Sequence, residues 1–138
     1  MVIFSFFGKR SDQKKLQSIL QELSQLRRPG DIPRRIQLCQ QAIAFAPRER
    51  HPELWAALHG ELGTNLYQHP TGNQAENIEL AIAHYNAALT VYTQRDFPEQ
   101  WAATQNNLAN AYNNRIRGDR AENIELAIAH YNAALTVY

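Results

Sequence analysis

The stretch AENIELAIAHYNAALTVY occupies residues 75–92, and the same eighteen letters return at residues 121–138. The two copies are offset by 46 residues, and Trp55 and Trp101 keep the same offset. Self-similarity at a fixed period of this length is typical of proteins built from stacked repeat units. The sequence therefore predicts a repeat architecture.

A more divergent unit precedes these two. A further shift by 46 residues places Leu62 over Leu16 and Tyr85 over Cys39. These matches keep apolar residues at equivalent positions, as units that bury one another require. We therefore predict three units, roughly residues 11–48, 52–94 and 97–138, preceded by an apolar segment at residues 1–10.

The apolar residues of each unit recur with a helical period. In the second half of the middle unit they follow steps of three and four: Ile78, Ala81, Ile82, Tyr85, Ala88, Leu89 and Tyr92. The first halves behave alike, with Trp55, Leu58, Leu62 and Leu66 in the middle unit and Trp101, Leu108, Ala111 and Tyr112 in the last. We therefore predict an all-α fold of three antiparallel helix pairs. The helices are expected near residues 11–28, 31–46, 52–69, 74–93, 97–115 and 120–137.

Capping and turn residues agree with these boundaries. A capping side chain stands three residues before a glutamate in three places: Asn73 and Glu76, Asp96 and Glu99, and Asp119 and Glu122. Gly72 and Gly118 fall between paired helices, and Pro98 falls in a first turn. Small residues on the predicted buried stripes allow close helix approach: Ala81, Ala88, Ala127 and Ala134.

Two segments of the last unit carry a family resemblance. NLANAY at residues 107–112 and AIAHYNAAL at residues 127–135 resemble the tetratricopeptide repeat, and Leu62-Gly63 and Pro47 match further positions of its pattern. The long units also resemble arrays of cyanobacterial proteins associated with CHAT domains, and the Asn-Asn-Leu-Ala step is similar to kinesin light chain repeats. The period of 46 residues departs from the usual repeat of about 34. The resemblance implies a right-handed α-solenoid over residues 11–138, with helices about a turn longer than usual.

No pattern of catalytic or metal-binding residues is found. Cys39 occupies the position of the buried Tyr85 and is interpreted as a packed thiol, because a catalytic cysteine needs a nearby base in a cleft. The five histidines form no metal-ligand spacing, and no phosphate-binding or dinucleotide-binding glycine motif occurs. We therefore expect neither an enzyme nor a cofactor nor a metal site.

The resemblance implies instead a concave face, lined by the first helix of each unit, that binds a peptide or a partner protein. On the last unit this face would carry an asparagine ladder, whose amides both donate and accept hydrogen bonds. Asparagine is a poor helix former, so five within nine residues indicate a function, although a solvated polar face is the alternative. The predicted groove residues are Lys14, Ser18, Gln21, Thr64, Tyr67, Gln68, Asn106, Asn107, Asn110, Asn113 and Asn114.

The two ends of the sequence suggest a second role. Residues 121–138 repeat an internal helix without any change toward a polar outer side, so we expect an apolar flank there. We predict that copies associate through the two ends as dimers or as head-to-tail chains, with a symmetric dimer of the last helix pair favoured. The opening MVIFSFFGKR is too short to span a bilayer. It is expected to pack against protein or, as an alternative, to lie at a membrane surface.

Charge and cysteine content restrict the remaining classes. Residues 1–50 hold ten Lys or Arg against four Asp or Glu, whereas residues 51–138 hold four against nine. The basic half carries no nucleic-acid-binding motif, so nucleic-acid binding is not expected. A single cysteine fits a reducing compartment and predicts a cytoplasmic protein. The sequence thus predicts a protein-interaction adaptor or scaffold, with an assembly piece or a membrane-surface adaptor as alternatives.

Overall fold

A computed structural model describes residues 10–138, so the predicted apolar segment lies outside the described residues except for Arg10. Within this part of the chain the structure is all-helical, and no strand occurs. The elements are α2 (Arg10–Gln25), the short 3-10 helix η1 (Pro29–Asp31), α3 (Ile32–Phe45), α4 (Pro52–Tyr67), α5 (Gln74–Leu89), α6 (Pro98–Asn113) and α7 (Arg120–Leu135).

Two of the three predicted capping sites are confirmed. Asn73 accepts a hydrogen bond from the backbone N–H of Glu76 at the start of α5, at 3.0 Å. Asp119 accepts from the N–H of Glu122 at the start of α7, at 3.2 Å. Each side chain satisfies one of the N–H groups that the first turn of a helix leaves without an intrahelical partner.

The third predicted cap, at Asp96 and Glu99, is wrong. The N-cap of α6 is Phe97, which makes no side-chain capping bond, and Pro98 follows it in the first turn. Helix α4 begins in the same way, with His51 as an uncapped N-cap before Pro52. Proline lacks an N–H and already has a helical φ, so it starts these helices without a side-chain acceptor.

The helices end earlier than the periodicity predicts, and the additional residues of the long repeat lie in the connections. Helix α2 stops at Gln25 because the chain turns extended before Pro29, as residues that precede proline prefer. In the α4–α5 and α6–α7 connections, Gly72 and Gly118 have φ values of 91° and 82°. These left-handed conformations favour glycine, which confirms that the two glycines mark turns.

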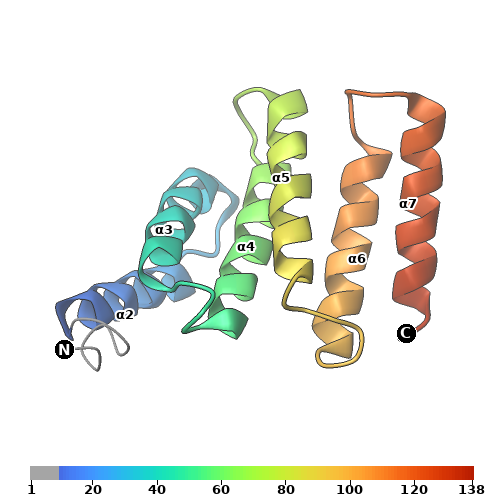
Figure 1. The fold of residues 1–138 in the computed structure, drawn as a ribbon. Coiled ribbons are helices and arrows are strands. Elements are labelled where there is room, and N and C mark those ends of the chain that lie inside the picture. The colour runs from blue at the N-terminus through green and yellow to red at the C-terminus, as the bar shows by residue number, and fades with distance from the viewer. Residues whose placement is uncertain (1–9) are drawn as a thin grey trace.

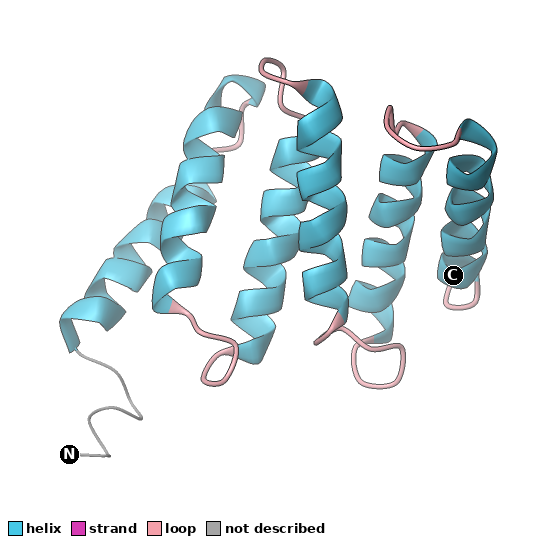
Figure 2. Ribbon diagram, turned by 45° about the horizontal axis from the view of Figure 1, so that its top comes forward, coloured by secondary structure: helices cyan, strands magenta, loops and turns pink. Residues whose placement is uncertain are grey.

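The helices follow one another in chain order along a row, and successive helices run in opposite directions (Figure 1). Each helix contacts its neighbours in sequence, and α4 also contacts α6. The connections alternate between the two edges of the row (Figure 2). The first helices of the second and third pairs are therefore in direct contact, which brings predicted groove residues of two units together.

The core contains the repeated apolar positions. Ala81, Ala88, Ala127 and Ala134 are all buried, as predicted. One cluster of buried side chains continues from Leu16 on α2 to Ala111 on α6 and includes Tyr85, which is the largest fully buried side chain among the described residues. The pairs are thus held together by shared apolar contacts, since no disulfide is available to a single cysteine.

Candidate functional site

The predicted groove residues of the first unit lie on α2. Lys14, Ser18 and Gln21 are exposed, and together with Gln17 and Leu20 they line a shallow hollow of about 570 Å³. Their spacing of three and four residues places them on one side of the helix. This side offers one cation and several neutral hydrogen-bonding groups.

Some of the predicted groove residues of the second unit make contacts within the fold, and others are exposed on its surface. The Thr64 hydroxyl lies 3.0 Å from the Tyr85 hydroxyl, so it is engaged within the α4–α5 pair. Gln68 is exposed, and with Thr64 it borders a pocket of about 470 Å³ where α4 meets the end of α2 and η1.

The pocket also contains an arginine that the sequence analysis did not select. The guanidinium of Arg35 donates to the backbone carbonyls of Leu23, at 3.0 Å, and Leu26, and it forms an ion pair with Glu61. The carbonyls at a helix C-terminus carry partial negative charge, so a cation is stabilised there. Arg35 therefore fixes the end of α2 to α4. No local pattern indicates this role, because its three partners lie on other elements.

The asparagines of the third unit have different environments. The Tyr131 hydroxyl donates to the side-chain oxygen of Asn110, inside the α6–α7 pair. The side-chain amide of Asn114 donates to the Tyr67 hydroxyl at 2.5 Å and so joins α6 to α4. The backbone and side-chain oxygens of Asn113 accept from Arg120. Three of the five predicted ladder residues therefore make hydrogen bonds within the fold.

Asn106 and Asn107 are the remaining two members. Asn106 is exposed and Asn107 is half-buried. The side chain of neither residue makes a hydrogen bond within residues 10–138, although their backbone groups belong to the helix. They occupy the middle of α6, one turn before Asn110. Their amide groups are thus available to a ligand that reaches this side of α6.

The one cysteine is buried, as predicted. Desolvation raises the pKa of the Cys39 thiol to about 12, and the negative charge of Glu61 acts in the same direction. The thiolate is the reactive form of cysteine, so the thiol is held in its unreactive state. It serves as a core residue at the position that Tyr85 occupies in the next pair.

Two histidines meet between α4 and α5. The Nδ1 atoms of His59 and His84 lie 2.9 Å apart, and the Trp55 ring covers His59 with its centroid 4.3 Å away. Desolvation and the neighbouring His84 lower the pKa of His59 to about 4. The corresponding place in the last pair is occupied by Gln105, whose side-chain oxygen lies 2.6 Å from Nδ1 of His130.

The histidine pair predicts a dependence of stability on pH. Unfolded His59 titrates near 6.5 and folded His59 near 4, so between these values the unfolded chain binds more protons and stability falls as the pH falls. Because the two histidines are only half-buried, solvent weakens the effect, and we expect the free energy of unfolding to fall by about 1 kcal/mol between pH 7 and pH 5. His59→Gln, which reproduces the arrangement around Gln105, should reduce the drop in melting temperature over this range by about 3 °C.

The control for this experiment is His51→Gln, because His51 is exposed and lies outside the pair. Melting would be followed by circular dichroism at pH 7, 6 and 5. Identical pH dependences of the wild type and His59→Gln would contradict the assignment of the effect to the pair.

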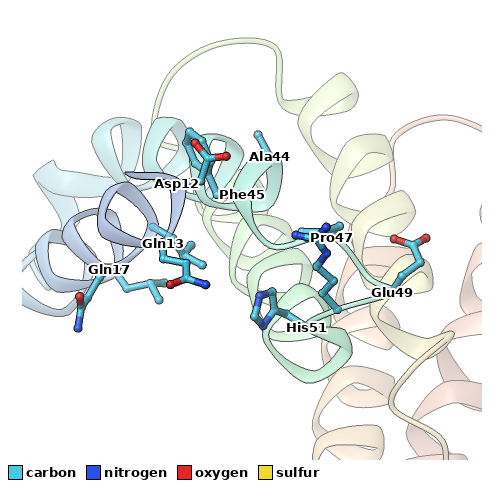
Figure 3. Close-up of a pocket in the computed structure, with 11 residues that line it drawn as sticks. Asp12, Gln13, Gln17, Ala44, Phe45, Pro47, Glu49 and His51 are labelled. Atoms are coloured by element: carbon cyan, nitrogen blue, oxygen red, sulfur yellow. The ribbon is translucent and has the colours of Figure 1, made fainter. Parts of the chain in front are cut away.

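A second pocket, of about 570 Å³, lies between α2 and the connection from α3 to α4. Figure 3 shows residues that line it from both segments: Asp12, Gln13 and Gln17 come from α2, and Pro47, Glu49 and His51 come from the connection. Leu16, Leu20 and Phe45 contribute an apolar lining. The charged groups around it form no ion pair with one another in the described part of the chain.

Within residues 10–138, no group of three or more His, Cys, Asp or Glu side chains is arranged to hold a metal ion. No helix of this part of the chain has the length and apolar character needed to cross a membrane. Comparisons of the chain with family models, with curated proteins and with solved structures give no match.

Proposed function

We propose that this protein is a tetratricopeptide-like right-handed α-solenoid of three helix pairs that binds a peptide or a partner protein along its concave face. The 46-residue period, the order of the helices along the row and the contact between α4 and α6 support this architecture. Arrays of helix pairs bring their first helices to one side and form an extended binding surface there. The role is that of an adaptor or scaffold.

The observation that carries this proposal is the pair of unengaged amides on α6. Asn106 and Asn107 offer donors and acceptors on a first helix, whereas Asn110 and Asn114 are engaged within the fold. The backbone N–H and C=O groups of an extended peptide satisfy both kinds of group. Lys14 and Gln21 on α2 and Gln68 on α4 extend the polar surface along the row.

The ladder is therefore tested with Asn106→Ala and Asn107→Ala together, leaving Asn110 and Asn114 in place to keep the fold intact. Peptides selected from a random displayed library on the wild-type chain would be titrated by calorimetry. Each lost amide contact with a ligand removes about 0.5–1.5 kcal/mol, so the double variant should bind about tenfold more weakly.

The matched control is Asn86→Ala with Asn132→Ala, because both residues are exposed and lie on second helices. This variant should retain wild-type affinity. If the selected peptides bind the Asn106/Asn107 variant as tightly as the control, the proposed groove is wrong.

A membrane-surface role would depend on the apolar segment at residues 1–10, which lies almost entirely outside the described residues, and it stays a prediction. Cytoplasmic localisation also stays a prediction. Sedimentation of the full chain with anionic vesicles, compared with a chain that lacks residues 1–8, tests the membrane alternative.

A further inference from the structure

The two identical segments have different exposure in the fold. Residues 75–92 and 121–138, which contain most of α5 and α7 and the three residues after each helix, have the same letters, but Ile78 is 1% exposed and its counterpart Ile124 is 38% exposed. On the same side of the last segment, Ile128 and Leu135 of α7 are 53% and 67% exposed and Tyr138 is 70% exposed, whereas their counterparts in the middle unit are partly buried. A continuous apolar stripe is thus covered in one copy and open in the other.

The exposure does not change on every side of the helix. Leu80 on α5 is 42% exposed, and its counterpart Leu126 on α7 is 40% exposed. Helix α5 contacts both α4 and α6, whereas α7 contacts α6 alone among the described elements. Helix α5 therefore has one neighbour more than α7: α6, the first helix of the next pair, also packs on it.

Helix α6 covers α5 with a specific polar contact as well as apolar ones. Directly after α6, the guanidinium of Arg115 donates to both carboxylate oxygens of Glu79 on α5, at 2.7 and 2.8 Å. Both side chains are about three-quarters buried, with exposures of 28% and 23%. Bidentate pairs of this kind combine attraction with a fixed geometry. The counterpart of Glu79 on α7 is Glu125, which is exposed and has no partner within residues 10–138.

We propose that the open stripe of the last repeated segment is a docking site for an amphipathic helix with the chemistry of α6; the stripe is formed by Ile124, Glu125, Ile128 and Leu135 on α7 and by Tyr138 after it. The occupant carries apolar residues on its buried side, as α6 does with Leu108 and Ala111 in the core cluster that it shares with α5, and an arginine just beyond its end that pairs with Glu125. This surface belongs to α7 and the residues that follow it, whereas the Asn106 groove belongs to α6, and the proposal is independent of the proposed function.

A second copy of this chain fits the stripe less well. In the described part of a copy, α6 is already covered by α5 and α7, and α2 has Leu23 at the place equivalent to Arg115. A symmetric pairing of two α7 helices supplies no arginine to Glu125, because the one arginine of α7, Arg120, donates to Asn113. The charge of Glu125 therefore favours a helix of a partner molecule over a second copy of this chain.

The probe for this site is a synthetic peptide of residues 96–117, which contains α6 and Arg115. A hydrocarbon staple between positions 99 and 103, both exposed in the fold, holds it helical without touching its buried side. Its helicity would be verified by circular dichroism before use. Titrated into the full chain, the labelled peptide should bind with saturable fluorescence anisotropy.

Matched variants locate the binding. Ile128→Ser should weaken binding about tenfold through lost apolar contact, and Glu125→Gln should weaken it several-fold. Arg115→Ala in the peptide should have the same effect as Glu125→Gln in the protein, and the two changes together should add little more. Leu126→Ser is the control and should leave the affinity unchanged, because its counterpart on α5 is exposed too.

Absence of binding by the helical peptide, or binding that Ile128→Ser and Leu126→Ser weaken equally, would overturn the proposal. So would a stable dimer of the chain alone, seen by light scattering, that Ile128→Ser dissociates, because the stripe would then be covered by a second copy.

Discussion

Tyr85→Ala is expected to lower the free energy of unfolding by about 3–5 kcal/mol, the range for removing a fully buried aromatic ring. The Tyr85 side chain is 2% exposed, packs directly on Gly63 of α4 and shares a hydrogen bond with Thr64. Its loss leaves a cavity between α4 and α5 and removes the partner of a half-buried hydroxyl. Denaturation by urea, followed by circular dichroism, measures the change.

Tyr131→Ala is the matched comparison, since Tyr131 stands at the same position of an identical helix but is only partly buried. The Tyr131 hydroxyl donates a hydrogen bond to the side-chain oxygen of Asn110, and the Tyr85 hydroxyl is hydrogen-bonded to the Thr64 hydroxyl in the same way. We expect a loss of about 1–2 kcal/mol, because less apolar surface returns to water. Equal losses at the two positions would show that the ring of the last pair is as tightly packed as that of the middle pair, contrary to the structure.

Gly63→Ala is expected to destabilise the protein by about 1–3 kcal/mol, although alanine is the better helix former by about 1 kcal/mol. A Cβ atom at position 63 would lie 2.8 Å from Cε1 and 3.0 Å from Cδ1 of Tyr85. Real side chains do not approach so closely, and the buried ring has little room to move away. The steric conflict therefore outweighs the gain in helix propensity.

Two further variants separate sterics from propensity. Ala109 occupies the equivalent position of α6 and is fully buried, so Ala109→Gly should cost about 1–2 kcal/mol through lower helix propensity together with the loss of a buried methyl group. In the second test, Gly63→Ala is combined with Tyr85→Leu, which removes the ring. In the Tyr85→Leu background, Gly63→Ala should cost much less free energy of unfolding than it does in the wild type. A double-mutant cycle reports this difference as a favourable coupling energy between the two positions. A penalty that persists without the ring would contradict the steric explanation.

Much of the fold was predictable because its signals are local or repeated. Helical periodicity gave six helices at the right places, and the period of 46 residues paired them. Caps at Asn73 and Asp119 were also correct, because a capping bond spans only three residues. The predicted cap at Asp96 failed because Pro98 sets its own helix start and leaves Phe97 as the N-cap.

The candidate site was less predictable. Sequence spacing placed five asparagines on and around one stripe of α6, but it could not distinguish those that bond within the fold from those that remain available. Asn114 reaches Tyr67, 47 positions away, and Arg35 reaches Glu61, 26 positions away. Such contacts depend on the distance and tilt between helices, to which no local pattern is sensitive.

By itself the sequence determined that residues 10–138 are all-helical, that the chain repeats every 46 residues and that an alanine-rich stripe is buried on α5 and on α7. Only the tertiary structure decided which copy of that stripe is covered. Residues 75–92 and 121–138 are identical, yet Ile78 is buried and Ile124 is partly exposed. Burial is a property of a side chain together with its neighbours, and the neighbours of an identical helix differ because α6 packs on the far side of α5, whereas no described helix does so for α7.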